Sequence, residues 1–197
     1  MRYWKVLVSL LLVFVFIGCG TEEGTAEKPV YKNGDRIELT SVVGSKIILL
    51  RKDGGFVLEG DESKILILDI FGTFCKPCQK EAANLMDFQL KNDKDILLIG
   101  FTYLEAVSDK YVVDNFASKF NAYYFIVNSP DNGKMVNTIT QDINYNQAVQ
   151  VPFKVVLKDG KYQKVTDVYE GNPDNKFYIG AIETDVIKND IEKIKAK

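Results

Sequence analysis

The 197-residue sequence contains no histidine, only three cysteines, a single tryptophan and five prolines. Without histidine, the chain has neither a Ser-His catalytic arrangement nor imidazole acid–base chemistry. Three cysteines cannot build a framework of structural disulfides. One CxxC pair supplies two ligands where a structural zinc site requires four, so no metal is expected unless two copies of the chain share one site.

An excess of basic charge is also lacking. Lysine and arginine together number 25 against 27 acidic residues, which gives a formal net charge of −2. No basic patch interleaved with aromatic residues occurs, so nucleic acid is not expected as a partner. The length suits a single domain with a full hydrophobic core.

The one long apolar run stands at the N-terminus. Arg2 and Lys5 precede the apolar segment Val6–Ile17, which is shorter than the roughly 20 residues of a membrane-spanning helix. Gly18-Cys19 follows, and the whole resembles a lipoprotein signal in which Cys19 is lipidated. We therefore expect a signal peptide at residues 1–18, a lipid-anchored tether at 19–30 and a folded domain at 31–197. A simple cleaved signal and an uncleaved anchor are the alternatives.

The stretch Ile65–Met86 carries the chemistry. Ile65–Ile70 is apolar except for Asp69, which predicts a buried strand. A turn follows, and Cys75-Lys76-Pro77-Cys78 then opens an amphipathic helix. A strand, a turn and CxxC at a helix N-terminus are typical of a dithiol redox centre.

The helix N-terminus determines the expected roles of the two cysteines. Unpaired N–H groups and the positive end of the helix dipole favour a thiolate at Cys75, which we predict to be the attacking and more exposed cysteine. Pro77 suits the first helical turn, where its missing N–H is not needed. Cys78, one turn further in, is predicted to be the resolving thiol. Lys76 is interpreted either as a charge that stabilises the thiolate or as a solvated residue.

Two carboxylates are candidates for proton transfer. Asp69 lies inside the apolar strand, where burial should raise its pKa and let it accept the proton of Cys78. The alternatives place Asp69 at a solvated edge or pair it with a lysine such as Lys64. Glu81 is interpreted as a proton shuttle or as a surface residue that favours the helix dipole.

The segment DIFGTFCKPCQKE resembles a thioredoxin-fold active site, and Asp69 matches the offset of the buried thioredoxin aspartate from the first cysteine. The longer pattern resembles the TlpA/ResA family of extracytoplasmic thiol–disulfide oxidoreductases, with Glu81 matching the family glutamate three residues after the second cysteine. The resemblance covers roughly residues 32–194. Phe74 replaces the usual tryptophan, and Asp69 replaces an asparagine of many members.

The resemblance implies an α/β thioredoxin-like fold, a central mixed β-sheet flanked by helices, with an added N-terminal β-hairpin. The implied function is a membrane-tethered, periplasmic or cell-surface reductant of protein disulfides, with apocytochrome c among its substrates. Its electron donor would be a membrane protein of the DsbD or CcdA kind, and it would need no cofactor beyond the Cys75–Cys78 disulfide. A disulfide-forming oxidase or isomerase and a non-catalytic binding module on the same fold are the alternatives.

A second landmark is Val151-Pro152, which opens the apolar run Phe153–Leu157. A proline at the start of a central strand indicates a bend or a cis bond. Thioredoxin-fold proteins place a cis-proline opposite the CxxC, and the resemblance assigns Pro152 to this place. Val151, where the family often has threonine, would offer its backbone to a substrate strand. Phe74, Lys76 and Pro77 are expected to contact substrate beside it. An ordinary trans-proline at a strand edge is the alternative.

Periodicity predicts the other elements. Lys52-Asp53-Gly54-Gly55 is a strong hairpin turn, and alternating strand and helix patterns predict a mainly parallel central sheet with helices on both faces. The expected strands are Lys46–Leu50, Phe56–Glu59, Ile96–Phe101, Tyr123–Val127, Phe153–Leu157 and Tyr162–Tyr169, and the expected helices are Glu105–Phe120, Lys134–Thr140 and Asn175–Lys195.

Overall fold

The computed structural model describes residues 28–196. The predicted signal peptide, Cys19 and most of the predicted tether lie outside the described residues. Within residues 28–196, no helix has both the length and the apolar character that crossing a membrane would need.

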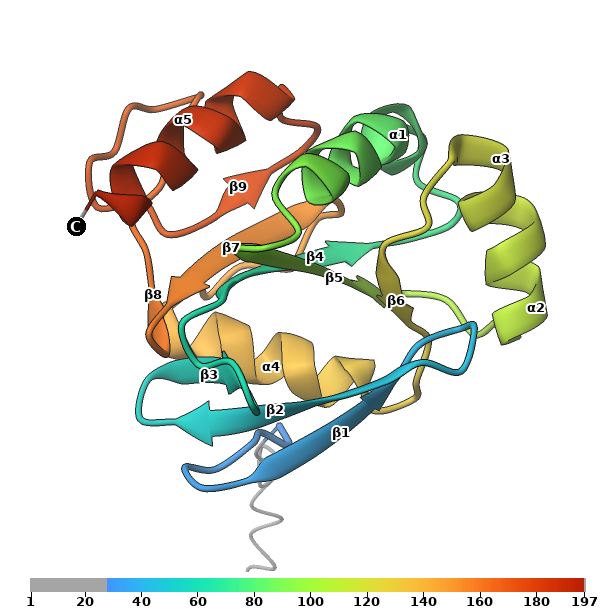
Figure 1. The fold of residues 1–197 in the computed structure, drawn as a ribbon, viewed down its shortest axis with the longest axis horizontal. Helices are drawn as coiled ribbons and strands as arrows, with labels where there is room; N and C mark the ends of the chain where they lie inside the picture. Colours follow the sequence, from blue (N-terminus) through green and yellow to red (C-terminus); the bar gives the residue numbers. More distant parts are fainter. Residues whose placement is uncertain (1–27, 197) are drawn as a thin grey trace, which may run out of the picture.

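A six-stranded sheet forms the centre of the domain (Figure 1). Its strands run in the order β6-β5-β4-β7-β8, and β9 also pairs with β7. The pairs β4–β5 and β5–β6 are parallel, whereas β7 is antiparallel to each of its neighbours. The sheet is therefore mixed. The strands are β4 (Ile65–Phe71), β5 (Ile96–Thr102), β6 (Phe125–Val127), β7 (Phe153–Lys158), β8 (Lys161–Tyr162) and β9 (Tyr178–Ile179).

A separate three-stranded antiparallel sheet precedes the central one and contains the expected hairpin. It consists of β1 (Arg36–Thr40), β2 (Lys46–Lys52) and β3 (Gly55–Leu58), with Lys52 opposite Gly55 at the turn. The two sheets approach closely at Gly55, where an added Cβ would lie 2.3 Å from the carbonyl oxygen of Gly160. Only glycine fits such a contact without displacing backbone.

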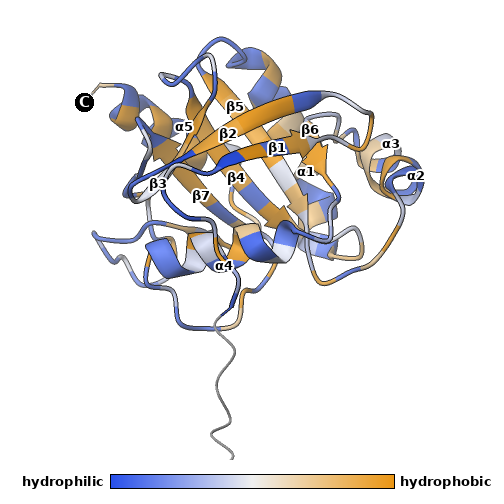
Figure 2. Cartoon of the chain, turned by 90° about the horizontal axis from the view of Figure 1, so that it is seen from below, coloured by the Kyte–Doolittle hydropathy of each residue, from blue (hydrophilic) through white to orange (hydrophobic). Residues whose placement is uncertain are grey.

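Helices cover both faces of the central sheet, as expected (Figure 1). Helices α1 (Lys76–Lys91) and α5 (Thr184–Lys195) lie on one face, and α4 (Asn132–Asp142) lies on the other, together with the small sheet. The central strands are hydrophobic along most of their length (Figure 2) because both of their faces are buried. Two hydrophobic clusters result, one on each face.

The pleat of β4 determines which way Asp69 points. Ile67 and Phe71 belong to the cluster under α1, and Leu68 and Ile70 belong to the cluster under α4. Because side chains alternate along a strand, Asp69 points toward α1 and the two cysteines. The sequence pattern of a single apolar run thus places one carboxylate inside the core.

Several expected elements were wrong in extent, and the predicted strand Tyr123–Val127 begins only at Phe125. The predicted helix Glu105–Phe120 begins only at Asp109, capped by the Ser108 hydroxyl, and consists of α2 (Asp109–Val112), a π-helical turn (Val113–Ala117) and α3 (Ser118–Phe120). The predicted helix Lys134–Thr140 is longer at both ends, as α4.

The largest error lies between β8 and α5. The predicted strand Tyr162–Tyr169 ends at Tyr162, and the predicted helix Asn175–Lys195 begins only at Thr184. Residues 163–183 instead leave the sheet as a long, mostly irregular segment, which we call the excursion. Within it, Tyr178–Ile179 pairs with β7 as strand β9. Gly180 has a φ of 74°, a left-handed conformation that interrupts any helix at this point.

Candidate active site

Cys75 and Cys78 are joined by a disulfide at the N-terminus of α1, with their Cα atoms 5.2 Å apart. Cys75 is the N-cap residue, and its Sγ accepts a hydrogen bond of 3.2 Å from the Cys78 backbone N–H. Pro77 occupies the first turn of the helix, as its missing N–H predicts. Cys75 is 6% exposed and Cys78 2%, so the order of exposure agrees with the expectation and both residues are buried.

The turn that leads into the cysteines is fixed from two sides. The Thr73 backbone N–H donates to the Glu105 carboxylate at 2.6 Å, and the Thr73 hydroxyl donates to its other oxygen. The Gln79 side-chain amide donates to the Thr73 carbonyl at 2.7 Å. These contacts hold the N-terminus of α1 against the carboxyl end of β5. Glu105 lies in a loop after β5 rather than in the expected helix, and from this loop its carboxylate contacts Thr73.

The Val151–Pro152 peptide bond is cis. The carbonyl oxygen of Val151 lies 3.5 Å from Cys75 Sγ, so the segment before β7 faces the disulfide directly. The Pro152 carbonyl accepts a hydrogen bond from the Gly180 N–H at 2.9 Å. Val151 and Pro152, which we call the cis-proline ledge, are therefore held by a hydrogen bond from the excursion, and the Val151 carbonyl faces Cys75.

Asp69 is 1% exposed and lies opposite Lys154 in the β4–β7 pairing. Lys154 is itself fully buried, and its Nζ is 3.4 Å from Asp69 Oδ1. That oxygen makes no hydrogen bond of good geometry among residues 28–196. The alternative of a solvated edge is wrong. The alternative of pairing with a lysine is right, but the lysine is Lys154 and not Lys64, which lies 3.5 Å from Asp61.

Glu81 completes a buried triad with Asp69 and Lys154. One turn beyond Cys78 on the same face of α1, it is 5% exposed and its Oε1 accepts a hydrogen bond from Lys154 Nζ. Its other oxygen accepts the Ile182 backbone N–H at 3.3 Å. The interpretation of Glu81 as a surface residue is therefore wrong, and two carboxylates share one ammonium beneath the disulfide.

Burial and charge shift all three pKa values. Burial raises the pKa of Glu81 to about 7, although Lys154 opposes the shift. Burial also raises the pKa of Asp69, again opposed by Lys154. For Lys154, burial alone would lower the pKa, but the two facing carboxylates outweigh it and raise the pKa. A carboxyl group with a pKa near neutrality can both accept and donate a proton at physiological pH.

The Glu81 shift predicts a pH dependence of stability. The folded chain holds a proton on Glu81 between its unfolded pKa of about 4.5 and its folded pKa of about 7, so the free energy of unfolding should fall as pH rises through this range. The expected loss is on the order of 3 kcal/mol. Urea unfolding at several pH values should show this slope in the native chain and a flatter one in Glu81→Gln. Equal slopes in the two proteins would contradict the assignment.

The remaining predicted site residues surround the disulfide on the outside. Phe74 is 54% exposed and packs back against Gly72, whose added Cβ would meet the Phe74 ring at 2.6 Å. Pro77 is exposed, and the exposed Lys76 donates to the Gln79 side-chain oxygen at 3.3 Å. The structure thus places these residues at the mouth of the site, while their roles toward a substrate stay predictions.

Lys154 and Glu105 were missed by the sequence reasoning. A lysine inside the apolar run Phe153–Leu157 is the same signal that singled out Asp69, and it could have been recognised as a buried charge that needs a partner. Glu105 gave no such signal, because a glutamate after a strand fits the first turn of a helix equally well.

The mixed sheet, the helices on both faces, the CxxC disulfide at the N-terminus of α1 and the facing cis-proline define a thioredoxin-like fold with a candidate redox site. No protein-family model matches the chain, and no curated protein matches it.

Several solved structures are similar to this chain, and two of the three that follow are described as thiol–disulfide proteins. A thiol:disulfide interchange protein of the thioredoxin family from Chlorobium tepidum TLS aligns with a TM-score of 0.54 at 14% identity, over 84% of this chain and 95% of that one. A proposed protein disulfide isomerase from Bacteroides thetaiotaomicron gives 0.53 at 16% identity, over 84% and 87%. StoA from Bacillus subtilis gives 0.51 at 14% identity, over 80% and 97%. The likeness establishes the fold.

Proposed function

We propose that the chain is a thiol–disulfide oxidoreductase that acts on protein substrates through Cys75 and Cys78. The observation that carries the proposal is the disulfide at the N-terminus of α1, with Cys75 Sγ facing the Val151 carbonyl. In the reduced chain, the Cys78 N–H and the helix dipole favour a thiolate at Cys75. The Val151 backbone lies where an extended substrate segment can pair with it.

The reaction proceeds by two thiol–disulfide exchanges. The Cys75 thiolate attacks one sulfur of a substrate disulfide, which forms a mixed disulfide and releases the other substrate sulfur as a thiolate. Cys78 then loses its proton and attacks Cys75 Sγ, which forms the Cys75–Cys78 bond and releases the second substrate thiolate. Two electrons pass from the chain to the substrate, and each released thiolate takes up a proton. The redox-active disulfide is the only redox group required.

The buried triad supplies the proton acceptor for the second exchange. Asp69 points from β4 toward α1, and Glu81 lies on α1 one turn beyond Cys78; both are buried, and Glu81 has a pKa near neutrality. Lys154 keeps one negative charge of the pair compensated. The proton of Cys78 therefore passes to a carboxylate of the triad as the new disulfide forms.

The finer part of the proposal concerns the direction of electron flow, the location of the protein, its electron donor and its substrate. We assign the chain to the reducing side, as an extracytoplasmic protein anchored by a lipid on Cys19 and recharged by a membrane electron donor of the DsbD or CcdA kind. Apocytochrome c is the substrate class that the TlpA/ResA resemblance suggests. The support is the N-terminal sequence pattern and the resemblance of the CxxC segment. A disulfide-forming or isomerase role is the second candidate, favoured by the structural likeness to a proposed disulfide isomerase.

The reduction potential of the Cys75–Cys78 pair distinguishes these directions. The full chain, purified in detergent, would be equilibrated with glutathione or dithiothreitol mixtures, and the oxidised fraction read by mass spectrometry. A potential near about −270 mV or below, the value of thioredoxin, is expected for a reductant. A potential near about −120 mV, the value of DsbA, would overturn this direction and favour the oxidase.

A further inference from the structure

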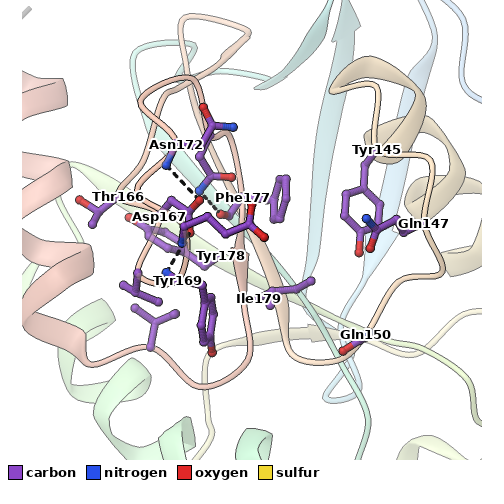
Figure 3. Close-up of a pocket in the computed structure, with 14 residues that line it drawn as sticks. Tyr145, Gln147, Gln150, Thr166, Asp167, Tyr169, Asn172, Phe177, Tyr178 and Ile179 are labelled. Carbon is purple, nitrogen blue, oxygen red and sulfur yellow. Dashed lines mark hydrogen bonds between the residues drawn. The ribbon is translucent and has the colours of Figure 1, made fainter.

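A pocket of about 320 Å³ lies beside the cis-proline ledge, between the loop that precedes β7 and the excursion at residues 163–183 (Figure 3). Tyr145, Gln147 and Gln150 line it from the loop, and Tyr169, Phe177 and Ile179 line it from the excursion. The proposed exchange chemistry does not use this pocket.

The walls of the pocket are fixed by contacts within the fold. Asp167 holds the excursion in shape, because its Oδ1 accepts the N–H groups of Tyr169 and Glu170 at 3.0 and 3.1 Å and its Oδ2 accepts that of Asn172 at 3.2 Å. The Phe177 ring lies 5.0 Å from that of Tyr145, edge to face, so the two sides of the pocket contact each other. The pocket is thus a built feature of the described chain.

The pocket lies within reach of the reacting sulfur. Gln150 lines it and directly precedes Val151, whose carbonyl oxygen is 3.5 Å from Cys75 Sγ. The Tyr169 side chain also lies close to the cis-proline ledge. Its hydroxyl would lie 2.9 Å from a Cβ added to Gly180, and the Gly180 N–H donates to the Pro152 carbonyl. A substrate strand advances about 3.3 Å per residue, so a side chain one or two residues from the bonded cysteine can enter the pocket.

The lining has the chemistry of a cation site. Asp167 and Glu170 contribute two carboxyl groups, and none of the residues that line the pocket is basic. The pKa of Asp167 is lowered by its backbone hydrogen bonds, so its carboxylate stays charged at neutral pH. Tyr145, Tyr169 and Phe177 add aromatic faces, which attract ammonium and guanidinium groups. Glu170 is exposed and can meet a charged group that enters from solvent.

We propose that this pocket is a subsite for a lysine or arginine side chain of the substrate polypeptide, close in sequence to the cysteine that Cys75 attacks. The proposal rests on the proposed function and adds a preference among substrates: disulfides flanked by basic residues react faster than those flanked by acidic or apolar residues. The specificity comes from the excursion at residues 163–183, whereas the exchange chemistry comes from α1 and the cis-proline ledge.

The test compares rates of exchange with short cysteine peptides. Each peptide carries its cysteine as a mixed disulfide with thionitrobenzoate and has arginine, leucine or glutamate two residues before or two residues after the cysteine. The reduced full chain in detergent attacks each peptide at an ionic strength of about 0.15 M, and the released thiol is followed by absorbance. Every rate is divided by the rate with dithiothreitol, which removes differences in the intrinsic reactivity of the peptides.

The native chain is expected to prefer arginine over glutamate peptides by about five- to tenfold, the size of an exposed ion pair together with a cation–π contact. Glu170→Gln should reduce the preference, and Glu170→Lys should abolish or invert it. The matched control is Glu62→Gln, which makes the same change of charge at an exposed site before β4, at the opposite end of that strand from the disulfide. The control should keep the preference of the native chain.

Equal rates for all peptides, a preference for leucine, or the same change of preference in Glu170→Gln and Glu62→Gln would overturn the subsite. In those three cases exchange itself is observed, so the proposed function stands. Absence of exchange with every peptide, while dithiothreitol still reacts with them, would overturn the proposed function and the subsite with it.

Discussion

Replacement of Cys75 by serine is expected to lower the rate of insulin disulfide reduction at least about a thousandfold. A serine hydroxyl is not ionised at neutral pH, so the nucleophile favoured by the N-terminus of α1 is lost. Replacement of Cys78 should give a different defect. The first exchange still takes place, but the mixed disulfide on Cys75 is no longer resolved from within the chain. The Cys78→Ser protein should therefore accumulate one covalently attached substrate per chain, visible as a mass increase that dithiothreitol removes.

The pair of variants distinguishes an enzyme from a binding module on the same fold. A binding module would show no thiol-dependent insulin reduction in the native chain and no trapped adduct in Cys78→Ser. Trapping in both variants to the same extent would contradict the assignment of Cys75 as the attacking thiol. Thermal unfolding of each variant controls for loss of structure, since both serines replace side chains buried in the cluster under α1.

Replacement of Lys154 by methionine is expected to destabilise the chain by about 3–5 kcal/mol at pH 7. The substitution keeps the volume of the side chain but leaves Asp69 and Glu81 buried beside each other without a counter-charge. The carboxyl groups must then take up protons or leave the core, and both changes cost free energy. Urea unfolding at pH 7 measures the loss, which should shrink as pH falls because protonation removes the repulsion.

A second pair of substitutions separates charge from packing. Asp69→Asn and Glu81→Gln introduced together with Lys154→Met should restore much of the lost stability, because no uncompensated charge then remains. Lys158→Met in the same strand is the matched control. Within residues 28–196, Lys158 Nζ donates to the Ile194 carbonyl alone, so its replacement should cost about 1 kcal/mol. Equal losses from Lys154→Met and Lys158→Met would contradict the triad as a charge-coupled unit.

The sequence predicts the parts of the site that depend on neighbours along the chain. The N-cap position of Cys75 and the place of Pro77 in the first turn follow from local patterns, the cis bond at Pro152 follows from the family resemblance, and the structure has each of them. The burial of Asp69 follows from a single polar residue in an apolar strand. These features need no knowledge of which strands are neighbours.

The missed parts depend on contacts between distant segments. Lys154 lies opposite Asp69 because β7 runs antiparallel beside β4. The two residues are 85 positions apart in the sequence, and the pattern of neither strand predicts that the strands pair. Glu105 reaches Thr73 because β4 and β5 end side by side. The final helix was extended too far because Ile179 and Ile182 continue its apolar spacing, although both belong to the excursion. Gly180 was the local signal against that helix.

The three-stranded sheet has a consequence for any attempt to shorten the protein. It shares with α4 the cover of one face of the central sheet, where Leu49 and Phe56 pack in the same cluster as Leu66, Leu68 and Ile70. Trimming the chain to the β4–α5 region would keep the cysteines, the cis-proline, the triad and α4, but it would expose to water the part of that face that the small sheet covers. Such a fragment would expose a broad apolar surface, and it would be lost to aggregation before its redox chemistry could be assayed.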